Sequence, residues 1–152
     1  MLIESPAEFL QKLPTHNRVL GLDVGEKTIG LALSDVMRRI ATPYATIERK
    51  KFTHDMEELK KIIAAQSVCG LIIGYPINMY GTLGPRTQST RAFVSTMSKH
   101  IELPMLLWDE RMSTMAVERT MLAADLSRKR RDELVDKLAA SYMLQGFLDS
   151  IA

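Results

Sequence analysis

The pattern of apolar and polar residues along the chain predicts an ordered series of short strands and helices. Runs that are fully apolar or alternate predict five strands, over residues 18–24, 28–34, 40–48, 68–74 and 104–108. Gly25 lies between the first two strands, which favours a tight hairpin turn. Pro43 in the third run is typical of an edge strand or a bulge.

Helical spacing of apolar residues fills the intervals between these strands. Ser5-Pro6-Ala7-Glu8 resembles a capping box and predicts a short helix that ends near Leu13. Longer helices are predicted over residues 53–66, 86–100, 113–124 and 128–150. Hairpins at the start and strand–helix alternation afterwards predict an α/β fold, with a mixed five-stranded central sheet flanked by helices.

Length and composition narrow the class of protein. The 152 residues suit one domain over 1–152, with residues 1–16 as an N-terminal helical extension. No apolar run approaches the roughly 20 residues of a membrane helix, and Glu4 and Glu8 interrupt any signal-peptide pattern. A single cysteine, Cys69, fits a reducing compartment. We therefore expect a cytoplasmic protein without a membrane partner.

Basic residues are clustered although the net charge is only +2. Arg128-Lys129-Arg130-Arg131 places four cations in succession, and Arg49-Lys50-Lys51 places three. Such clusters suit contacts with nucleic-acid phosphates, because each contact releases counterions. The alternative for each cluster is a solvated helix start or a solvated loop.

Asp23 is the most conspicuous acid, because it lies within the apolar run 18–24. An ionised carboxylate in a buried strand is costly unless it is paired, hydrogen-bonded or bound to a metal. The alternative is that Asp23 caps the turn at Gly25.

Two further sets of acids follow later in the chain. Asp109-Glu110-Arg111 comes directly after a predicted strand, where ligands of parallel sheets usually bind, although it also suits a helix start with a surface ion pair. Asp136 lies on the last predicted helix, on a face shared with Ala139, Ala140, Met143 and Phe147. A carboxylate on an apolar face is unusual, and a boundary aspartate paired with an arginine is the alternative there.

Three separated sets of acids indicate a metal cluster built from oxygen ligands. Such hard ligands without cysteine or histidine favour Mg²⁺ or Mn²⁺ over Zn²⁺. The sequence contains no Walker-type glycine loop and no serine–histidine motif of a covalent hydrolase. Two divalent ions held by carboxylates support phosphodiester cleavage.

At these residues the sequence resembles a known family. Four segments carry the resemblance: LGLDVGEKTIGLALSD at 20–35, GYPINMYGTLGP at 74–85, DERMST at 109–114 and VDKLAA at 135–140. They are similar, in this order, to the signature segments of the YqgF-like pre-16S rRNA nucleases, which are also described as Holliday junction resolvases. Thr28, Tyr80 and Met112 depart from the usual pattern, whereas every candidate carboxylate is present.

The resemblance implies a ribonuclease-H-like fold and a metal-dependent nuclease that uses two Mg²⁺ or Mn²⁺ ions. By position, its metal-binding and catalytic acids are Asp23, one or both of Asp109 and Glu110, and Asp136. The residues expected to contact nucleic acid are Lys27, Arg86, Arg111, Arg128, Lys129, Arg130 and Arg131. The implied partners are pre-rRNA within the small-subunit precursor or branched DNA, bound by a monomer or a weak homodimer.

Other functions stay open at this point. A Holliday junction resolvase in DNA repair is one, and a non-catalytic RNA-binding factor for ribosome maturation is another. A nucleotide-phosphate enzyme of the actin and sugar-kinase type also carries an Asp-x-Gly hairpin. That class needs two such lobes, and 152 residues supply one.

Overall fold

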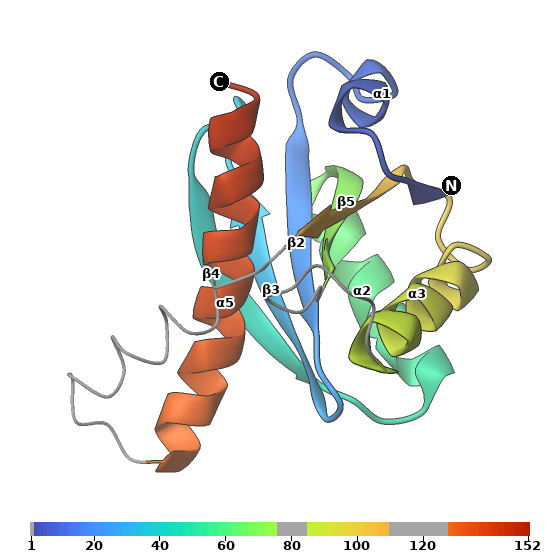
Figure 1. The fold of residues 1–152 in the computed structure, drawn as a ribbon, viewed down its shortest axis with the longest axis vertical. Helices are drawn as coiled ribbons and strands as arrows, with labels where there is room; N and C mark the ends of the chain where they lie inside the picture. Colours follow the sequence, from blue (N-terminus) through green and yellow to red (C-terminus); the bar gives the residue numbers. More distant parts are fainter. Residues whose placement is uncertain (1, 76–84, 110–127) are drawn as a thin grey trace.

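Strands and helices follow one another in the predicted order around a mixed sheet (Figure 1). The computed structural model describes residues 2–75, 85–109 and 128–152. Its elements are β1 (Leu2–Ile3), α1 (Pro6–Gln11), β2 (Arg18–Val24), β3 (Thr28–Ser34), β4 (Ala41–Glu48), α2 (Phe52–Gln66), β5 (Val68–Tyr75), α3 (Pro85–Met97), β6 (Met105–Asp109) and α5 (Arg128–Ser150). The helix predicted over 113–124 lies outside the described residues.

The sheet has six strands in the order β1-β6-β5-β2-β3-β4, and not the five predicted. β2, β3 and β4 form antiparallel pairs, whereas β5 pairs in parallel with β2 and with β6. The additional strand, β1, is two residues long and pairs in parallel with Met105 and Leu106. A segment of two residues is too short to show a hydrophobic pattern, so the sequence does not predict this strand. It forms by pairing with the edge of β6.

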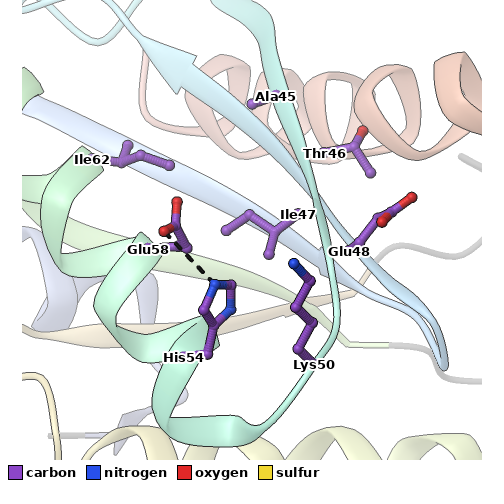
Figure 2. Close-up of a pocket in the computed structure, with 8 residues that line it drawn as sticks. All are labelled: Ala45, Thr46, Ile47, Glu48, Lys50, His54, Glu58 and Ile62. Carbon is purple, nitrogen blue, oxygen red and sulfur yellow. Dashed lines mark ion pairs between the residues drawn. The ribbon is translucent and has the colours of Figure 1, made fainter.

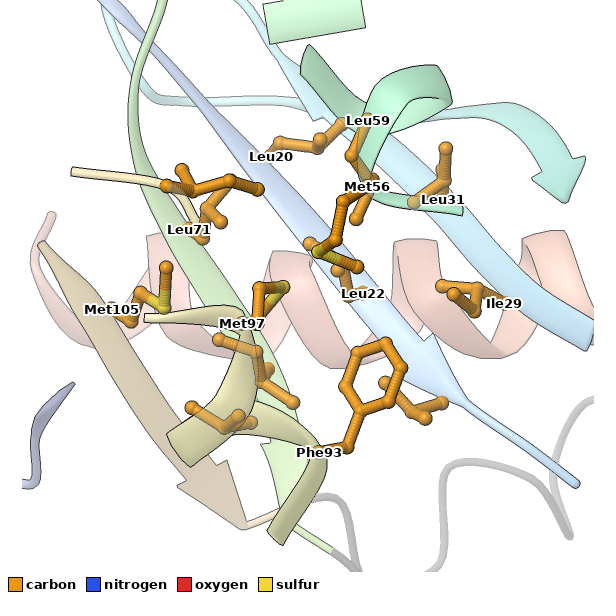
Figure 3. Packing of buried hydrophobic residues seen from close by; sticks show 14 of the residues in the cluster. Leu20, Leu22, Ile29, Leu31, Met56, Leu59, Leu71, Phe93, Met97 and Met105 are labelled. Atoms are coloured by element: carbon orange, nitrogen blue, oxygen red, sulfur yellow. The ribbon is translucent and has the colours of Figure 1, made fainter. Parts of the chain in front are cut away.

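Helices cover both faces of the sheet and enclose two hydrophobic cores. On one face, α2 and α3 pack on alternate residues of the strands, such as Leu20 and Leu22 of β2 and Leu71 of β5 (Figure 3). On the other face, α1 and α5 pack on Val19 and Ile72. Each fully buried Leu or Ile contributes roughly 1.5–3 kcal/mol by leaving water. Within the described part of the chain, no helix is both long and apolar enough to cross a membrane.

A compact loop closes the end of the sheet between β3 and β4. The Asp35 carboxylate accepts backbone hydrogen bonds from Arg39 at 2.8 Å, Ile40 at 2.9 Å and Met37 at 3.2 Å. Arg38 has a left-handed φ of 56° within this loop, and its Nε donates to the carbonyl oxygen of Asn17 at 2.7 Å. The loop therefore ties β3 and β4 to the segment that precedes β2.

The sheet ends at β4, and this edge is blocked to further pairing along its first half. Pro43 has no N–H group, and the N–H of Ala41 donates to Gln145 Oε1 at 2.8 Å. The predicted bulge is present, because Pro43 pairs with Ala32 and Ala45 with Leu31, which leaves Tyr44 without a counterpart in the register. Both features hinder addition of another strand at this edge.

The hydrogen bonds to Asp35 make the stability of the loop depend on pH. They favour the ionised carboxylate, led by the bond from Ile40, and lower the pKa of Asp35 below its usual value of 3.8. A lowered pKa in the folded state adds stability that is present above pH 3.8 and is lost as the pH falls through the folded-state pKa.

We expect Asp35→Asn to be less stable than the wild type at pH 7 and to approach it as the pH falls. Denaturant titrations between about pH 7 and pH 2 would measure the difference in free energy of unfolding. A difference that stays constant over this range would contradict the role assigned to the Asp35 charge.

Candidate active site

Asp23 is a buried carboxylate on β2, one of the two innermost strands of the sheet. Its exposed fraction is 8 %, and it pairs in register with Gly30 of β3. Gly21, two positions earlier, faces α5, and alternate residues of a strand face the same side. Asp23 therefore faces the α5 side of the sheet.

The turn after Asp23 contains a backbone hydrogen bond of its own. The N–H of Gly25 donates to the carbonyl oxygen of Thr28 at 2.8 Å, which joins the two ends of the turn.

Helix α5 approaches β2 unusually closely at Gly21. A Cβ atom added to Gly21 would lie 3.0 Å from Leu144 Cβ and 3.5 Å from the carbonyl oxygen of Ala140. The predicted apolar face of the helix is confirmed, because Ala139, Ala140 and Phe147 are buried against the sheet. The missing side chain of Gly21 sets how near α5 lies to the strand that carries Asp23.

The backbone of α5 brings Asp136 towards the level of Asp23. Figure 1 shows α5 running antiparallel to β2. Ala140 and Leu144 lie opposite Gly21, and moving two residues along a strand covers about 6.6 Å. Asp136 is one turn before Ala140, which covers about 6 Å in the matching direction. The side chain of Asp136 lies outside the described part of the structure.

The parallel pairing of β2, β5 and β6 places the end of β6 near the same point. Leu22 pairs with Ile73, Ile73 with Leu107, and Tyr75 with Asp109. Two strand spacings separate β2 from β6, so the backbones of Asp23 and Asp109 are roughly 10 Å apart. The side chain of Asp109, and all of Glu110 and Arg111, lie outside the described residues.

Trp108, next to the last residue of β6, packs against α5. Its ring meets that of Phe147 edge-on, with centroids 5.5 Å apart and an interplanar angle of 81°. Phe147 also meets Phe9 of α1 at 5.9 Å. The residue before the Asp109 position is thus held by the same helix that carries Asp136.

Only some of the basic residues predicted to contact nucleic acid have described side chains. Lys27 is exposed on the turn between β2 and β3, four residues after Asp23. Arg86 lies in the first turn of α3, and residues 128–131 form the first turn of α5, but the described structure gives only their backbones.

Sequence reasoning missed the roles of two residues near Asp23, namely Arg49 at the turn that follows it and Gly21 in the strand before it. Arg49 Nη1 donates to the carbonyl oxygen of Gly25 at 2.5 Å, and its guanidinium lies 5.0 Å from the centre of the Phe93 ring. Arg49 was predicted only as part of a basic cluster. The close approach of α5 at Gly21 was not predicted, although a glycine inside an apolar strand is itself a signal of close backbone approach.

The described side chains do not by themselves form a metal site. Among them, no three carboxylate, imidazole or thiol groups gather closely enough to hold an ion. The predicted set depends on the side chains of Asp109 and Asp136 and on Glu110. The buried Asp23 carboxylate, facing the helix that carries Asp136, is the described part of that set and suits a hard divalent cation.

The chain belongs to the RuvX family, whose model, described as "Holliday junction resolvase", matches residues 17–150. A protein of Paramagnetospirillum magneticum named "Putative pre-16S rRNA nuclease" is 55% identical over 150 residues, which covers 99% of this chain and 97% of that protein. A protein of Rhodobacter capsulatus with the same name is 51% identical and covers 100% and 96%. The family resemblance inferred from the four segments is confirmed.

A solved structure confirms the expected class of fold. RuvC of T. thermophilus, in complex with a Holliday junction substrate, matches with a TM-score of 0.54 at 14% identity. The match covers 90% of this chain and 96% of RuvC. The protein therefore has the predicted ribonuclease-H-like fold.

We predict that Gly21→Ala separates α5 from β2. The added methyl group meets a Cβ atom and not the free end of a side chain, so overpacking costs about 1–3 kcal/mol. Because α5 also carries Asp136, which the sequence predicts as a metal ligand, we expect the variant to bind Mn²⁺ more weakly in calorimetric titrations.

Gly70→Ala is a matched control for this variant. Its added Cβ lies 2.8 Å from Leu13 Cδ2 and from Phe9 Cζ, on the same face of the sheet but against α1. We expect this variant to lose stability without weakening Mn²⁺ binding. Equal Mn²⁺ affinity in both variants would contradict the role of Gly21 in spacing α5.

Proposed function

We propose that this protein is a divalent-metal-dependent nuclease that cleaves phosphodiester bonds in structured nucleic acid and processes the 5′ end of pre-16S rRNA. The observation that carries the proposal is the buried carboxylate of Asp23, on the sheet face covered by α5. An ionised carboxylate in a core strand needs favourable partners, and a bound divalent cation would be one of them. Relatives at least half identical over nearly the whole chain carry the matching name.

The proposed ligands are Asp23, Asp136 and one or both of Asp109 and Glu110, which would hold two Mg²⁺ or Mn²⁺ ions. Bound there, such ions activate water and stabilise the leaving oxygen of a phosphodiester. Lys27, Arg86, Arg111 and the basic cluster 128–131 are proposed to hold the phosphates of the substrate beside these acids. We place this reaction in the cytoplasm, on the small-subunit precursor.

The packing of β6 favours Glu110 over Asp109 as the partner of Asp23. Leu106 and Trp108 belong to the core under α5, whereas Met105 and Leu107 belong to the opposite core. Since successive strand residues face opposite sides, the even-numbered positions share the face of Asp23. We propose that Glu110, the next even-numbered residue after the end of β6, faces the same side.

Cleavage of a four-way DNA junction is a second candidate activity, because the matching family model is described as a Holliday junction resolvase. Phosphate and metal contacts carry no base information, so the same acids suit either substrate. We favour RNA because the relatives named for pre-16S rRNA share far more sequence with this chain than RuvC does.

We expect Asp23→Asn to lower cleavage of a labelled pre-16S 5′ leader by more than about 100-fold, because loss of even outer-shell partners of a metal costs about 10–100-fold. The assay would contain Mg²⁺ or Mn²⁺, with a four-way DNA junction tested in parallel. Asp35→Asn, at the opposite end of the sheet, is the control and should retain activity per folded molecule.

Wild-type activity in a folded Asp23→Asn variant would exclude Asp23 from the reaction. Salt-dependent RNA binding without cleavage by the wild type would instead indicate a non-catalytic maturation factor. Preferential cleavage of the junction would support the resolvase.

We also expect Glu110→Gln to lose more activity than Asp109→Asn in the same assay. Both changes neutralise one carboxylate at neighbouring positions, so each is the control for the other. The reverse order would show that the alternation along β6 does not extend to the ligand set.

A further inference from the structure

The basic triplet Arg49-Lys50-Lys51, between β4 and α2, has one side chain that points into the protein and two that are exposed to solvent. Arg49 is turned inward, towards the Gly25 carbonyl and the Phe93 ring. Its backbone N–H also donates to the carbonyl oxygen of Lys27 at 2.8 Å. Arg49 therefore fastens the connection between β4 and α2 to the turn that follows Asp23, while Lys50 and Lys51 remain exposed.

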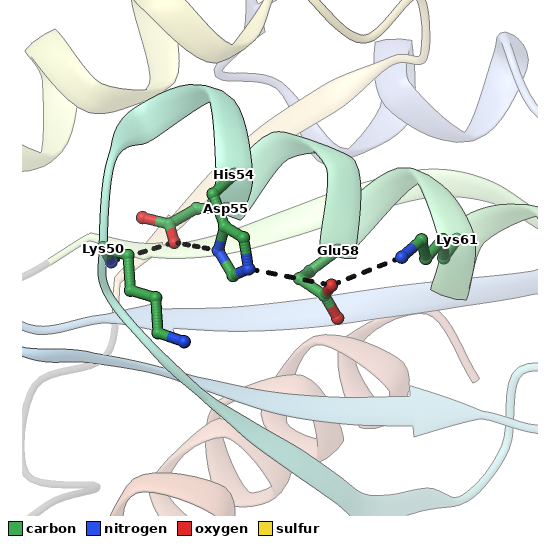
Figure 4. Close-up of polar contacts among 5 residues, drawn as sticks. All are labelled: Lys50, His54, Asp55, Glu58 and Lys61. Carbon is green, nitrogen blue, oxygen red and sulfur yellow. Dashed lines mark hydrogen bonds and ion pairs between the residues drawn. The ribbon is translucent and has the colours of Figure 1, made fainter.

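A buried acid fixes the backbone of the two exposed lysines. Asp55 is 1% exposed, and its Oδ1 accepts the N–H of Lys50 at 3.0 Å (Figure 4). The N–H of Asp55 in turn donates to the carbonyl oxygen of Lys51 at 3.1 Å. The position of this connection is thus determined by hydrogen bonds, which leaves both lysine side chains available for an external partner.

The described acids near these lysines form no ion pair with them. Figure 2 shows the Lys50 side chain next to His54 in an open groove of about 440 Å³ between β4 and α2, with Glu58 beyond the His54 ring and Glu48 on the β4 side. Glu58 lies 3.6 Å from Lys61 and 4.0 Å from His54. Among the described residues, no ion pair involves Lys27, Lys50 or Lys51.

The lysines lie at the same end of the sheet as Asp23, with Lys50 on the α2 side of the sheet and Asp23 on the α5 side. In register, Asp23 pairs with Gly30 and Gly30 with Thr46, four residues before Lys50. Lys50 is thus two strand spacings to the side of Asp23 and four residues further along the chain direction of β4. The backbones of Asp23 and Lys50 are therefore roughly 16 Å apart. That distance corresponds to about four to five base pairs of duplex.

We propose that Lys27, Lys50 and Lys51 form a lysine rim that binds substrate phosphates several nucleotides from the bond that is cleaved. This inference rests on the proposed function, because it assigns the rim to the nucleic acid held at Asp23. The partner is a phosphodiester backbone, since three exposed cations on segments joined by the Arg49–Lys27 backbone hydrogen bond suit a polyanion. The rim extends the binding surface across the Asp23 turn to the start of α2.

The test compares Lys50→Gln/Lys51→Gln with Lys60→Gln/Lys61→Gln in otherwise wild-type protein. Both double variants remove two positive charges, and Lys60 and Lys61 are exposed further along α2. Binding of a fluorescent pre-16S 5′ leader is measured in EDTA across a salt series, so that cleavage does not interfere.

Loss of two phosphate contacts should reduce the slope of log affinity against log salt by about 1.4–1.8. At 0.1 M salt this reduction corresponds to about 25–60-fold weaker binding. The Lys60/Lys61 control should bind like the wild type, and Lys27→Gln should reduce the slope by about 0.7–0.9.

Equal salt slopes for the two double variants would overturn the proposal, because general charge would then explain any change. Weaker binding of the Lys50/Lys51 variant alone would support it, even where the cleavage assay shows no turnover. Failure of the lysine rim is therefore distinguishable from failure of the nuclease assignment.

Discussion

The close approach of α5 to β2 at Gly21 is the constraint on which the rest of the structure depends. Without a side chain at Gly21, Leu144 Cβ and the backbone of Ala140 reach the strand directly. This contact closes the core on one face of the sheet. It also determines the depth at which Asp23 is buried, because Asp23 follows on the same face two residues later.

The two ends of the sheet differ in the interactions that they contain, with the Asp35 loop at one end and the turn after Asp23 at the other. At one end, Asp35 organises the connection between β3 and β4, and Gln145 Nε2 donates to the carbonyl oxygen of Arg39 at 2.9 Å. These bonds link the loop to α5 and stabilise the fold. At the other end, Arg49 supports the turn after Asp23 through one carbonyl and one aromatic ring. A fixed turn keeps a buried carboxylate in one geometry, which favours binding of a ligand with little loss of entropy.

Charge follows the same division. The exposed lysines 27, 50 and 51 lie near the Asp23 end and are attached to hydrogen-bonded backbone. A central acid with cations at its margin suits a polyanion, because the acids retain a divalent cation while the cations attract phosphates. This arrangement suits a nucleic acid as the ligand. A nucleic acid is also the ligand expected for a member of the RuvX family and for the proposed nuclease activity.

The sequence by itself determined the elements whose signal is local. The bounds of β2 and β3 agree with their apolar runs to the residue, and the buried face of α5 agrees with its helical spacing. The tertiary structure alone decided β1, the closeness of α5 at Gly21 and the inward turn of Arg49. Arg49 binds a carbonyl 24 residues away, and β1 exists only beside β6. Periodicity reports which residues prefer burial, whereas contacts between distant segments depend on atoms that no local pattern contains. For Asp23, the sequence identified the acid, and the fold decided which helix it faces.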